Sequence, residues 1–256
     1  MGGHYLLPDS PTYFGGYFDL ILNNHAVCSL PSLEKAVLTD SPQVYGGAEV
    51  FKTHEEQIQV AREFTHAMHS ISMAPALAWP RNINLSGHRV MLDVGGGSGA
   101  HSMGAIQHWP NLQAIVFDIA PVCEVAQEFV AAAGFSGRIS TCPGDMWNDP
   151  FPPTDVHFYS NIFHDWPAEK CLFLSRKSFD SLARGGRIIL HEVLYNDQKT
   201  GPFAAASYSM IMLGWATGKQ YSGRELSEML ENASFRDIEI KPTFGFMSIV
   251  TGRKAT

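Results

Sequence analysis

The sequence predicts an α/β fold in which a doubly wound sheet ends in an antiparallel hairpin and is preceded by a helical segment. Two observations favour this fold. From about residue 88, apolar runs of strand length alternate with stretches of helical periodicity, a pattern typical of a parallel sheet with helices on both faces. The last two strand candidates are joined only by residues 241–245, a link too short for anything but an antiparallel hairpin.

The first 80 residues are predicted to be helical. Apolar residues recur at helical spacing over residues 13–24 and 26–38. Thr53 and Glu56 have the spacing of a capping box, which predicts that a long helix begins at Thr53. Pro80 is expected to end this segment, because proline interrupts the hydrogen bonds of a helix interior.

The strands of the α/β part can be placed from their short apolar runs. They are predicted at residues 90–94, 114–118, 139–142, 156–161, 187–192, 236–240 and 246–251. Helices are predicted between them, for example over residues 122–133 and 168–182. The first five strands are therefore expected to be parallel.

Composition excludes several classes of function. The chain has 256 residues, a formal net charge of −7 and no cluster of Lys and Arg, which argues against a nucleic-acid or anionic membrane partner. No uninterrupted apolar run reaches membrane-spanning length. The four cysteines form no C-x-x-C pair, so we expect no metal site and no disulfide framework, and free thiols fit a cytoplasmic protein.

A glycine-rich turn follows the first predicted strand, in Leu92-Asp93-Val94-Gly95-Gly96-Gly97-Ser98-Gly99. Such strand-to-helix turns bring backbone N–H groups and a helix N-terminus close to a nucleotide-like ligand. Gly95, Gly97 and Ala100 fit the dinucleotide pattern G-x-G-x-x-A, with Asp118 placed for a ribose contact. Gly95, Gly97 and Gly99 equally fit the G-x-G-x-G turn of class I methyltransferases. The predicted C-terminal hairpin favours this second interpretation over the dinucleotide pattern. An ordinary tight turn is the third interpretation.

Two further motifs follow the third and fourth strands. In Gly144-Asp145-Met146, the carboxylate could accept a hydrogen bond from an adenine amine and the thioether could lie against the ring, although a plain loop has the same composition. His164 follows the fourth strand, where open α/β sheets place ligands, and could take a proton near neutral pH. Glu192, at the end of the fifth strand, could fix its tautomer. A packing histidine and a solvated glutamate are the alternatives.

Taken in order, these motifs resemble the O-methyltransferase family that depends on S-adenosyl-L-methionine (SAM). That family includes plant caffeate and flavonoid enzymes, acetylserotonin methyltransferase and bacterial small-molecule enzymes. The resemblance is carried by Leu92 to Gly99, Phe117-Asp118, Gly144-Asp145-Met146, His164-Asp165-Trp166 and Gly185-Gly186-Arg187-Ile188-Ile189. It implies a class I, Rossmann-like methyltransferase fold, with residues 81–256 as the SAM-binding catalytic domain and residues 1–80 as a helical segment covering the substrate pocket.

The resemblance also implies roles for individual residues. For the cofactor, the matching positions are Gly95, Gly97 and Gly99 around SAM, Asp118 at the ribose, Ile119, Asp145 and Met146 at the adenine, and Ser160 at a position where plant members often carry a lysine that touches the cofactor. For the acceptor, an aromatic or polyketide-like molecule, they are Phe64, Met68 and Asn161. For catalysis, they are His164 as the base that deprotonates the acceptor hydroxyl, with Glu192 and Gln220 orienting it.

Two departures from the family pattern leave alternatives open. Gln220 stands where plant members carry a second orienting glutamate, which would make His164 a weaker base. That change would suit an acidic phenol or a carbon nucleophile, so C-methylation, hydroxylation, decarboxylation and pericyclic chemistry are alternatives. Family members usually carry a further N-terminal dimerisation domain, and this sequence starts near the end of that region, as a natural short form or an excised catalytic domain would. The usual homodimer is therefore in doubt, and a non-catalytic SAM-binding domain is a further alternative.

Overall fold

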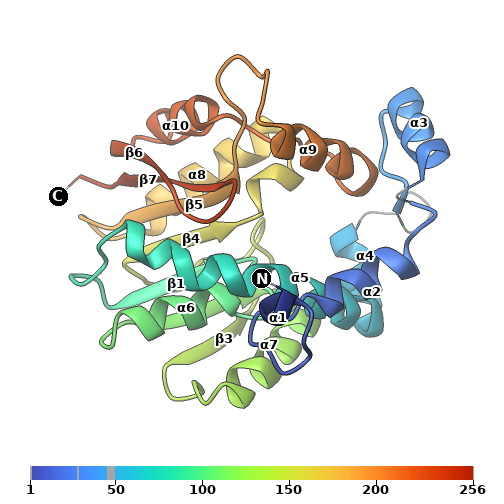
Figure 1. Cartoon of the computed structure of the whole chain (residues 1–256). Coiled ribbons are helices and arrows are strands. Elements are labelled where there is room, and N and C mark those ends of the chain that lie inside the picture. The colour runs from blue at the N-terminus through green and yellow to red at the C-terminus, as the bar shows by residue number, and fades with distance from the viewer. Residues whose placement is uncertain (1, 28, 45–49, 256) are drawn as a thin grey trace.

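The structure is a computed structural model that describes residues 2–27, 29–44 and 50–255 (Figure 1). Its centre is a seven-stranded sheet in the order β3-β2-β1-β4-β5-β7-β6. The strands are β1 (Val90–Val94), β2 (Gln113–Asp118), β3 (Ile139–Pro143), β4 (Val156–Ser160), β5 (Arg187–Val193), β6 (Arg236–Pro242) and β7 (Met247–Arg253). Each predicted strand is present, and no predicted end differs by more than two residues.

The pairing of the strands confirms the predicted topology. Strands β1 to β5 pair in parallel, whereas β7 pairs antiparallel with both β5 and β6. The buried apolar residues form two large clusters, and neighbouring residues of β1 belong to different ones: Leu92 is part of the first cluster and Met91 is part of the second. Because side chains alternate along a strand, the two clusters occupy the two faces of the sheet, as the doubly wound fold requires.

Helices cover both faces (Figure 1). Helices α8 (Ala168–Ser181) and α10 (Gly223–Asn232) contribute to the first cluster, and α6 (Ala100–His108) and α7 (Ala120–Ala132) contribute to the second. The predicted helices 122–133 and 168–182 correspond to α7 and α8. An additional helix, α9 (Phe203–Trp215), precedes α10.

The N-terminal part is helical, as predicted, but its boundaries differ. It contains α1 (Gly2–Tyr5), α2 (Gly15–Asn23), α3 (Leu30–Thr39), α4 (Val50–Glu56) and α5 (Ile58–Ala78). Helix α3 begins four residues later than predicted, because the Ser29 side chain accepts a hydrogen bond from the N–H of Ser32 and caps the helix there. Helix α5 ends at Ala78, and the 3-10 turn η2 (Trp79–Asn82) contains Pro80.

The predicted capping box at Thr53 is wrong. Thr53 is buried inside α4, and the long helix α5 begins after Gln57, which makes no side-chain capping bond. The Phe51 ring packs against Trp166 at a centroid distance of 5.3 Å. This tertiary contact favours helix before Thr53 and overrides the local capping signal.

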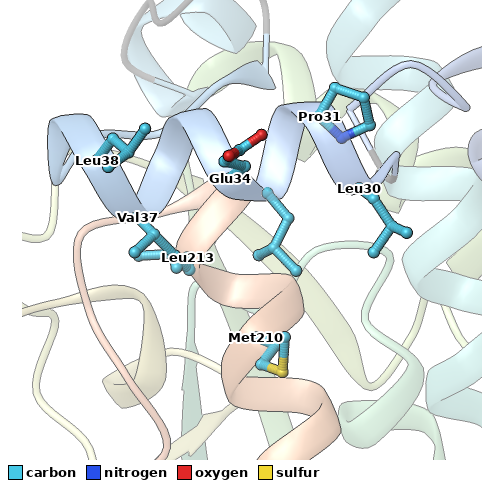
Figure 2. A pocket seen from close by; sticks show the side chains of 8 residues that line it. Leu30, Pro31, Glu34, Val37, Leu38, Met210 and Leu213 are labelled. Atoms are coloured by element: carbon cyan, nitrogen blue, oxygen red, sulfur yellow. The ribbon is translucent and has the colours of Figure 1, made fainter.

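Helices α3 and α9 form an open apolar groove (Figure 2). Leu30, Val37 and Leu38 of α3 and Met210 of α9 line it and are all more than half exposed. Cys123, Cys142 and Cys171 carry free thiols, and Cys28 lies outside the described residues. None of the helices in the described part of the chain combines the length and the apolar character needed to cross a membrane.

Candidate active site

A cavity of about 1010 Å³ lies at the carboxyl ends of the strands. Helices α2, α4, α5 and α9, the glycine turn, the ends of β2 and β4 and the tip of the β6–β7 hairpin all contribute to its walls. The predicted site residues that line it are Phe64, Met68, Gly95, Gly97, Asp118, Ile119, Asp145, Met146, Ser160, Asn161 and His164. The other three, Gly99, Glu192 and Gln220, lie behind this wall.

The glycine turn connects β1 to α6 through left-handed backbone. Gly95, Gly97 and Gly99 have φ values of 64°, 55° and 76°, a region that side chains other than glycine adopt only with strain. Gly99 is the residue that precedes the first turn of α6. The hydroxyl of Ser98 in this turn lies 2.8 Å from Nδ1 of His69, which ties α5 to the turn.

Asp118 ends β2 beside the glycine turn. Its Oδ2 accepts a hydrogen bond from the N–H of Gly97 at 2.9 Å, and its Oδ1 accepts one from the N–H of Ile119 at 2.8 Å. Burial raises the pKa of Asp118 to about 6, although both hydrogen bonds favour the ionised form. The carboxylate is thus fixed at the cavity wall with lone pairs left for a ligand.

Asp145 and Met146 follow β3 in the loop that closes another side of the cavity. The Asp145 carboxylate accepts hydrogen bonds from the N–H of Trp147 and from the side chain of Asn148, at 2.9 and 2.6 Å. Met146 is partly buried against the core. Asp145 therefore shapes its own loop, and the adenine contacts of both residues stay predictions.

His164 lies in the 3-10 turn η3 (Phe163–Asp165) directly after β4 and is buried. Its Nδ1 is 3.0 Å from Oε2 of Glu192, and its Nε2 is 3.5 Å from Oδ1 of Asp165. The other oxygen of Glu192 accepts hydrogen bonds from the N–H groups of Ile162 and Phe163. Glu192 of β5 therefore holds the backbone of the turn with Oε1, while Oε2 lies at ion-pair distance from the ring.

The electrostatics of His164 are set by two opposing causes. Burial on its own would lower the pKa of His164, but the negative charges of Glu192 and Asp165 outweigh it and the pKa is raised above its ordinary value. Burial also raises the pKa of Asp165 to about 7. A carboxylate oxygen can only accept, so when Nδ1 bonds to Glu192 it carries the ring proton and Nε2 keeps its lone pair.

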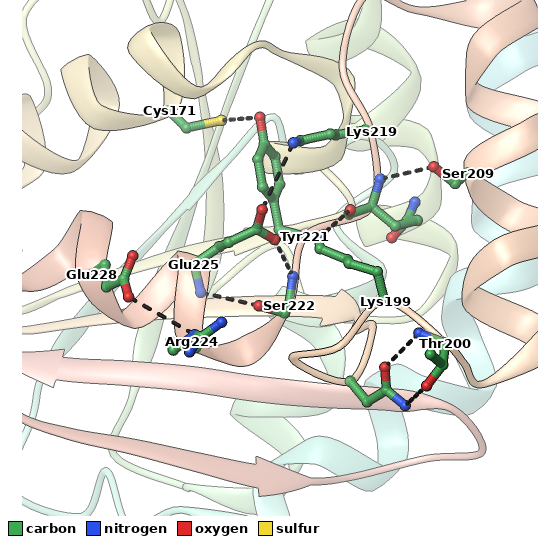
Figure 3. A network of polar contacts seen from close by, with 12 residues as sticks. Cys171, Lys199, Thr200, Ser209, Lys219, Tyr221, Ser222, Arg224, Glu225 and Glu228 are labelled. Carbon is green, nitrogen blue, oxygen red and sulfur yellow. Dashed lines mark hydrogen bonds and ion pairs between the residues drawn. The ribbon is translucent and has the colours of Figure 1, made fainter.

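Gln220 also reaches His164, from the segment between α9 and α10. Its Nε2 lies 3.1 Å from Nδ1 of His164, while its Oε1 has no partner in the described part of the chain. Figure 3 shows the network that holds this segment: Lys199 contacts the carbonyl of Gln220 and the carboxylate of Glu225. The hydroxyl of Tyr221 donates to the carbonyl of Trp166 at 2.7 Å, which joins the segment to the turn after His164.

The remaining walls of the cavity are mainly aromatic and apolar. Phe64 and Met68 lie one turn apart on α5, and the Phe64 ring is 6.1 Å from that of Trp215 on α9. The Tyr208 ring packs edge-on against His164 at 5.1 Å. Tyr208 and Trp215 are seven residues apart on one helix, so helical periodicity could have identified Trp215.

Some lining residues carry no sequence signal for this role. His54 is buried in α4, where burial lowers its pKa to about 4, and only the packing of α4 brings it to the cavity. Asp165, in contrast, lies within the His164-Asp165-Trp166 motif and could have been identified from it. In the described ranges, no group of three or more His, Cys, Asp or Glu residues is arranged to hold a metal ion.

Comparisons with a family model, with curated proteins and with solved structures all point to O-methyltransferases. Residues 31–236 match the model of the O-methyltransferase domain family. The chain is 33% identical over 258 residues to 3-hydroxy-5-methyl-1-naphthoate 3-O-methyltransferase of Streptomyces sahachiroi, with 100% of this chain and 74% of that protein covered. It is 29% identical over 205 residues to acetylserotonin O-methyltransferase of Bos taurus, with 80% of this chain covered.

The chain spans only 58% of the bovine protein. Among solved structures, human N-acetylserotonin methyltransferase in complex with SAM superimposes with a TM-score of 0.89 and 26% identity, covering 100% of this chain and 74% of that one.

Proposed function

The chain belongs to the O-methyltransferase domain family, and from this premise we propose that it moves the methyl group of SAM to a hydroxyl of an aromatic small molecule. We propose His164 as the base of this reaction. The observation that carries this proposal is the imidazole at the cavity wall. A carboxylate oxygen lies 3.0 Å from its Nδ1. With the ring proton on Nδ1, the lone pair of Nε2, which lies 3.5 Å from Asp165 Oδ1, would accept the proton of the acceptor hydroxyl.

The residues around the glycine turn fit the cofactor. Asp118 offers a partly buried carboxylate held by two N–H groups, which suits a pair of ribose hydroxyls. A Cβ added at Gly97 would meet nothing within 4 Å, so that side of the turn is open. SAM supplies a methyl group already activated by its sulfonium. Ile119, Asp145 and Met146 would hold the adenine.

The acceptor is proposed to be aromatic. Phe64, Met68, Tyr208 and Trp215 give the cavity flat, apolar walls beside His164, and such walls suit a ring stacked or clamped between them. The names of the Streptomyces and bovine relatives specify a hydroxylated naphthoate and acetylserotonin, which agrees with this chemistry.

His164 would take the proton of the acceptor hydroxyl while the hydroxyl oxygen bonds to the methyl carbon, and the bond between that carbon and the sulfur of SAM would break to leave S-adenosylhomocysteine. Glu192 would then stabilise the imidazolium that forms, as the carboxylate of a catalytic triad does. Most of the rate enhancement would come from holding the two reactants in line, and the base would add roughly 10² to 10⁴-fold. Cytoplasmic location, lack of a nucleic-acid partner and a possible homodimer stay sequence-based predictions.

The test is His164→Ala, assayed against a panel that includes 3-hydroxy-5-methyl-1-naphthoate and N-acetylserotonin. We expect kcat to fall by about 10² to 10⁴-fold, while calorimetry shows unchanged binding of S-adenosylhomocysteine. His108→Ala, at the exposed far end of α6, is the matched control. Turnover close to that of the wild type would exclude the base role, and the mass and NMR spectrum of the product distinguish methylation of oxygen from methylation of carbon.

A further inference from the structure

A hydrogen-bonded chain of three side chains runs behind one wall of the cavity. Ser160 at the end of β4 and His191 on β5 are register partners in parallel strands, and Ser160 Oγ lies 3.1 Å from His191 Nδ1. On the other side of the ring, His191 Nε2 lies 2.9 Å from Oγ1 of Thr243, in the β6–β7 turn. Ser160 lines the cavity, whereas His191 is fully buried.

The direction of each hydrogen bond between Ser160, His191 and Thr243 follows from the bond that Thr243 makes to the backbone. The carbonyl of Met247 can only accept, and the Thr243 hydroxyl donates to it at 3.1 Å. A hydroxyl has one proton, so Thr243 must accept from His191 Nε2, which therefore carries the ring proton. Nδ1 is then the acceptor of a neutral imidazole, and Ser160 must donate its only proton to it. Because the Ser160 proton is used in this bond, only the lone pairs of Ser160 Oγ are available to a ligand in the cavity.

The imidazole keeps this direction because it stays neutral. Burial, together with the neighbouring His101 ring at a centroid distance of 5.2 Å, holds the pKa of His191 well below its ordinary value. Burial likewise lowers the pKa of His101 to about 3. Neither ring gains a proton near neutral pH, so His191 cannot become a donor at both nitrogens.

We propose that Thr243 and His191 fix Ser160 as a hydrogen-bond acceptor, so that this part of the cavity selects a ligand with an ammonium, N–H or O–H donor. Asn161 supports the same polarity: its Oδ1 is buried, has no partner in the described part of the chain and belongs to the same cavity. The inference rests on the proposed function.

The donor could come from the amino-acid end of the cofactor or from the acceptor, and the experiment distinguishes the two. Calorimetry measures binding of S-adenosylhomocysteine, of its analogue without the amino group and of its analogue without the carboxylate. We expect loss of the amino group to weaken wild-type binding by about 10- to 100-fold, as for a hydrogen bond to a charged group. Ser160→Ala should weaken binding of S-adenosylhomocysteine similarly and leave the affinity for the analogue without the amino group unchanged.

His191 and Thr243 are positioning residues, and matched variants of Thr243 test their role. Thr243→Ser keeps the hydroxyl and should behave as the wild type. Thr243→Val removes the acceptor for Nε2–H, lets the ring proton move to Nδ1 and should reduce the preference for the amino group several-fold. The ¹⁵N shifts of the His191 ring report the tautomer directly, with Nε2–H expected in the wild type. Thr141→Val, on β3, is the control.

The outcomes separate the alternatives. If Ser160→Ala leaves binding of all three cofactor analogues unchanged but raises KM for the phenolic acceptor tenfold or more, the donor belongs to the acceptor and the proposed polarity stands. If the variant changes neither, or the ring proton of wild-type His191 is on Nδ1, the proposal is overturned. Failure of the wild type to bind S-adenosylhomocysteine would overturn the proposed function, whereas the NMR test needs no ligand and decides the hydrogen-bond direction independently.

Discussion

At the scale of single residues, His164 is held at one ring nitrogen by a charged and by an uncharged side chain. Glu192 Oε2 lies 3.0 Å from Nδ1 and Gln220 Nε2 lies 3.1 Å from the same atom. Nδ1 carries only one proton, and an amide presents either its oxygen or its nitrogen after a half-turn. With Oε1 turned toward Nδ1, Gln220 shares the proton with Glu192 and leaves Nε2 of the ring free to act as the base.

Substitution at these two positions should move the pH profile in opposite directions. Gln220→Glu adds a carboxylate and raises the pKa of His164, so the protonated, inactive ring persists to higher pH. The acid limb of kcat should move upward by on the order of one pH unit. Glu192→Gln removes a carboxylate, lowers the pKa, moves the limb downward and reduces the plateau rate. Initial rates between pH 5 and 9 measure this, and a limb that stays fixed in both variants would contradict it.

Asp118 should make cofactor binding depend on pH. Its pKa is raised to about 6 by burial, so the carboxylate is ionised above that pH and gains a proton below it. We expect calorimetric affinity for S-adenosylhomocysteine to fall as pH drops from 8 to 5. Asp118→Asn should lose about tenfold or more at pH 8 and should be less pH-dependent than the wild type; equal pH dependence in the two proteins would refute the assignment.

At the scale of the elements, the packing of α5 on α6 supports the glycine turn. A Cβ added at Gly104 of α6 would lie 2.1 Å from the carbonyl oxygen of Ala76 on α5, so only glycine allows this approach. His69 on α5 also contacts Ser98 in the turn. The N-terminal helical segment is thereby connected to the part of the sheet that is proposed to bind the cofactor.

Gly104→Ala should therefore destabilise the protein. The added methyl group forces the two helices apart, and overpacking of this kind costs about 1–3 kcal/mol of the free energy of unfolding, more than the helix propensity that alanine gains. Gly137→Ala is the matched control, since a Cβ there would meet nothing within 4 Å. Urea titration followed by circular dichroism measures both, and equal midpoints would show that α5 adjusts without cost.

At the scale of the whole molecule, the cavity is shared between the helical segment and the sheet. Phe64 and Met68 of α5 line it together with Asp118 and His164 from the sheet. The proposed division into residues 1–80 and 81–256 therefore describes two contributors to one site. In this arrangement, a ligand in the cavity should stabilise both parts at once.

Thermal unfolding tests this expectation. We expect a single cooperative transition in differential scanning calorimetry that shifts as a whole when S-adenosylhomocysteine is added. At a free concentration one hundred times its Kd, the ligand should add about 2.7 kcal/mol to the free energy of unfolding. Two transitions, of which only the one that belongs to the sheet shifts, would show instead that the helical segment folds independently of the site.

Local patterns in the sequence were sufficient to predict the elements of the sheet. Each strand is specified by its own apolar run, and the short 241–245 link allows only a hairpin. The glycine turn and the His164-Asp165-Trp166 motif could be located for the same reason, because neighbouring residues carry the signal. The capping box at Thr53 failed because Phe51 contacts Trp166, a residue distant in sequence.

By itself, then, the sequence determined the fold and the family and predicted which edge of the sheet bears the candidate site, since these depend on periodicity and on ordered motifs. Only the tertiary structure decided that Glu192 and Gln220 meet at one nitrogen of His164, and that Ser160 presents an acceptor to the cavity. Those properties depend on distances between side chains from separate elements and on the single proton that an imidazole or a hydroxyl can donate. Neither quantity is encoded in the spacing of residues along the chain.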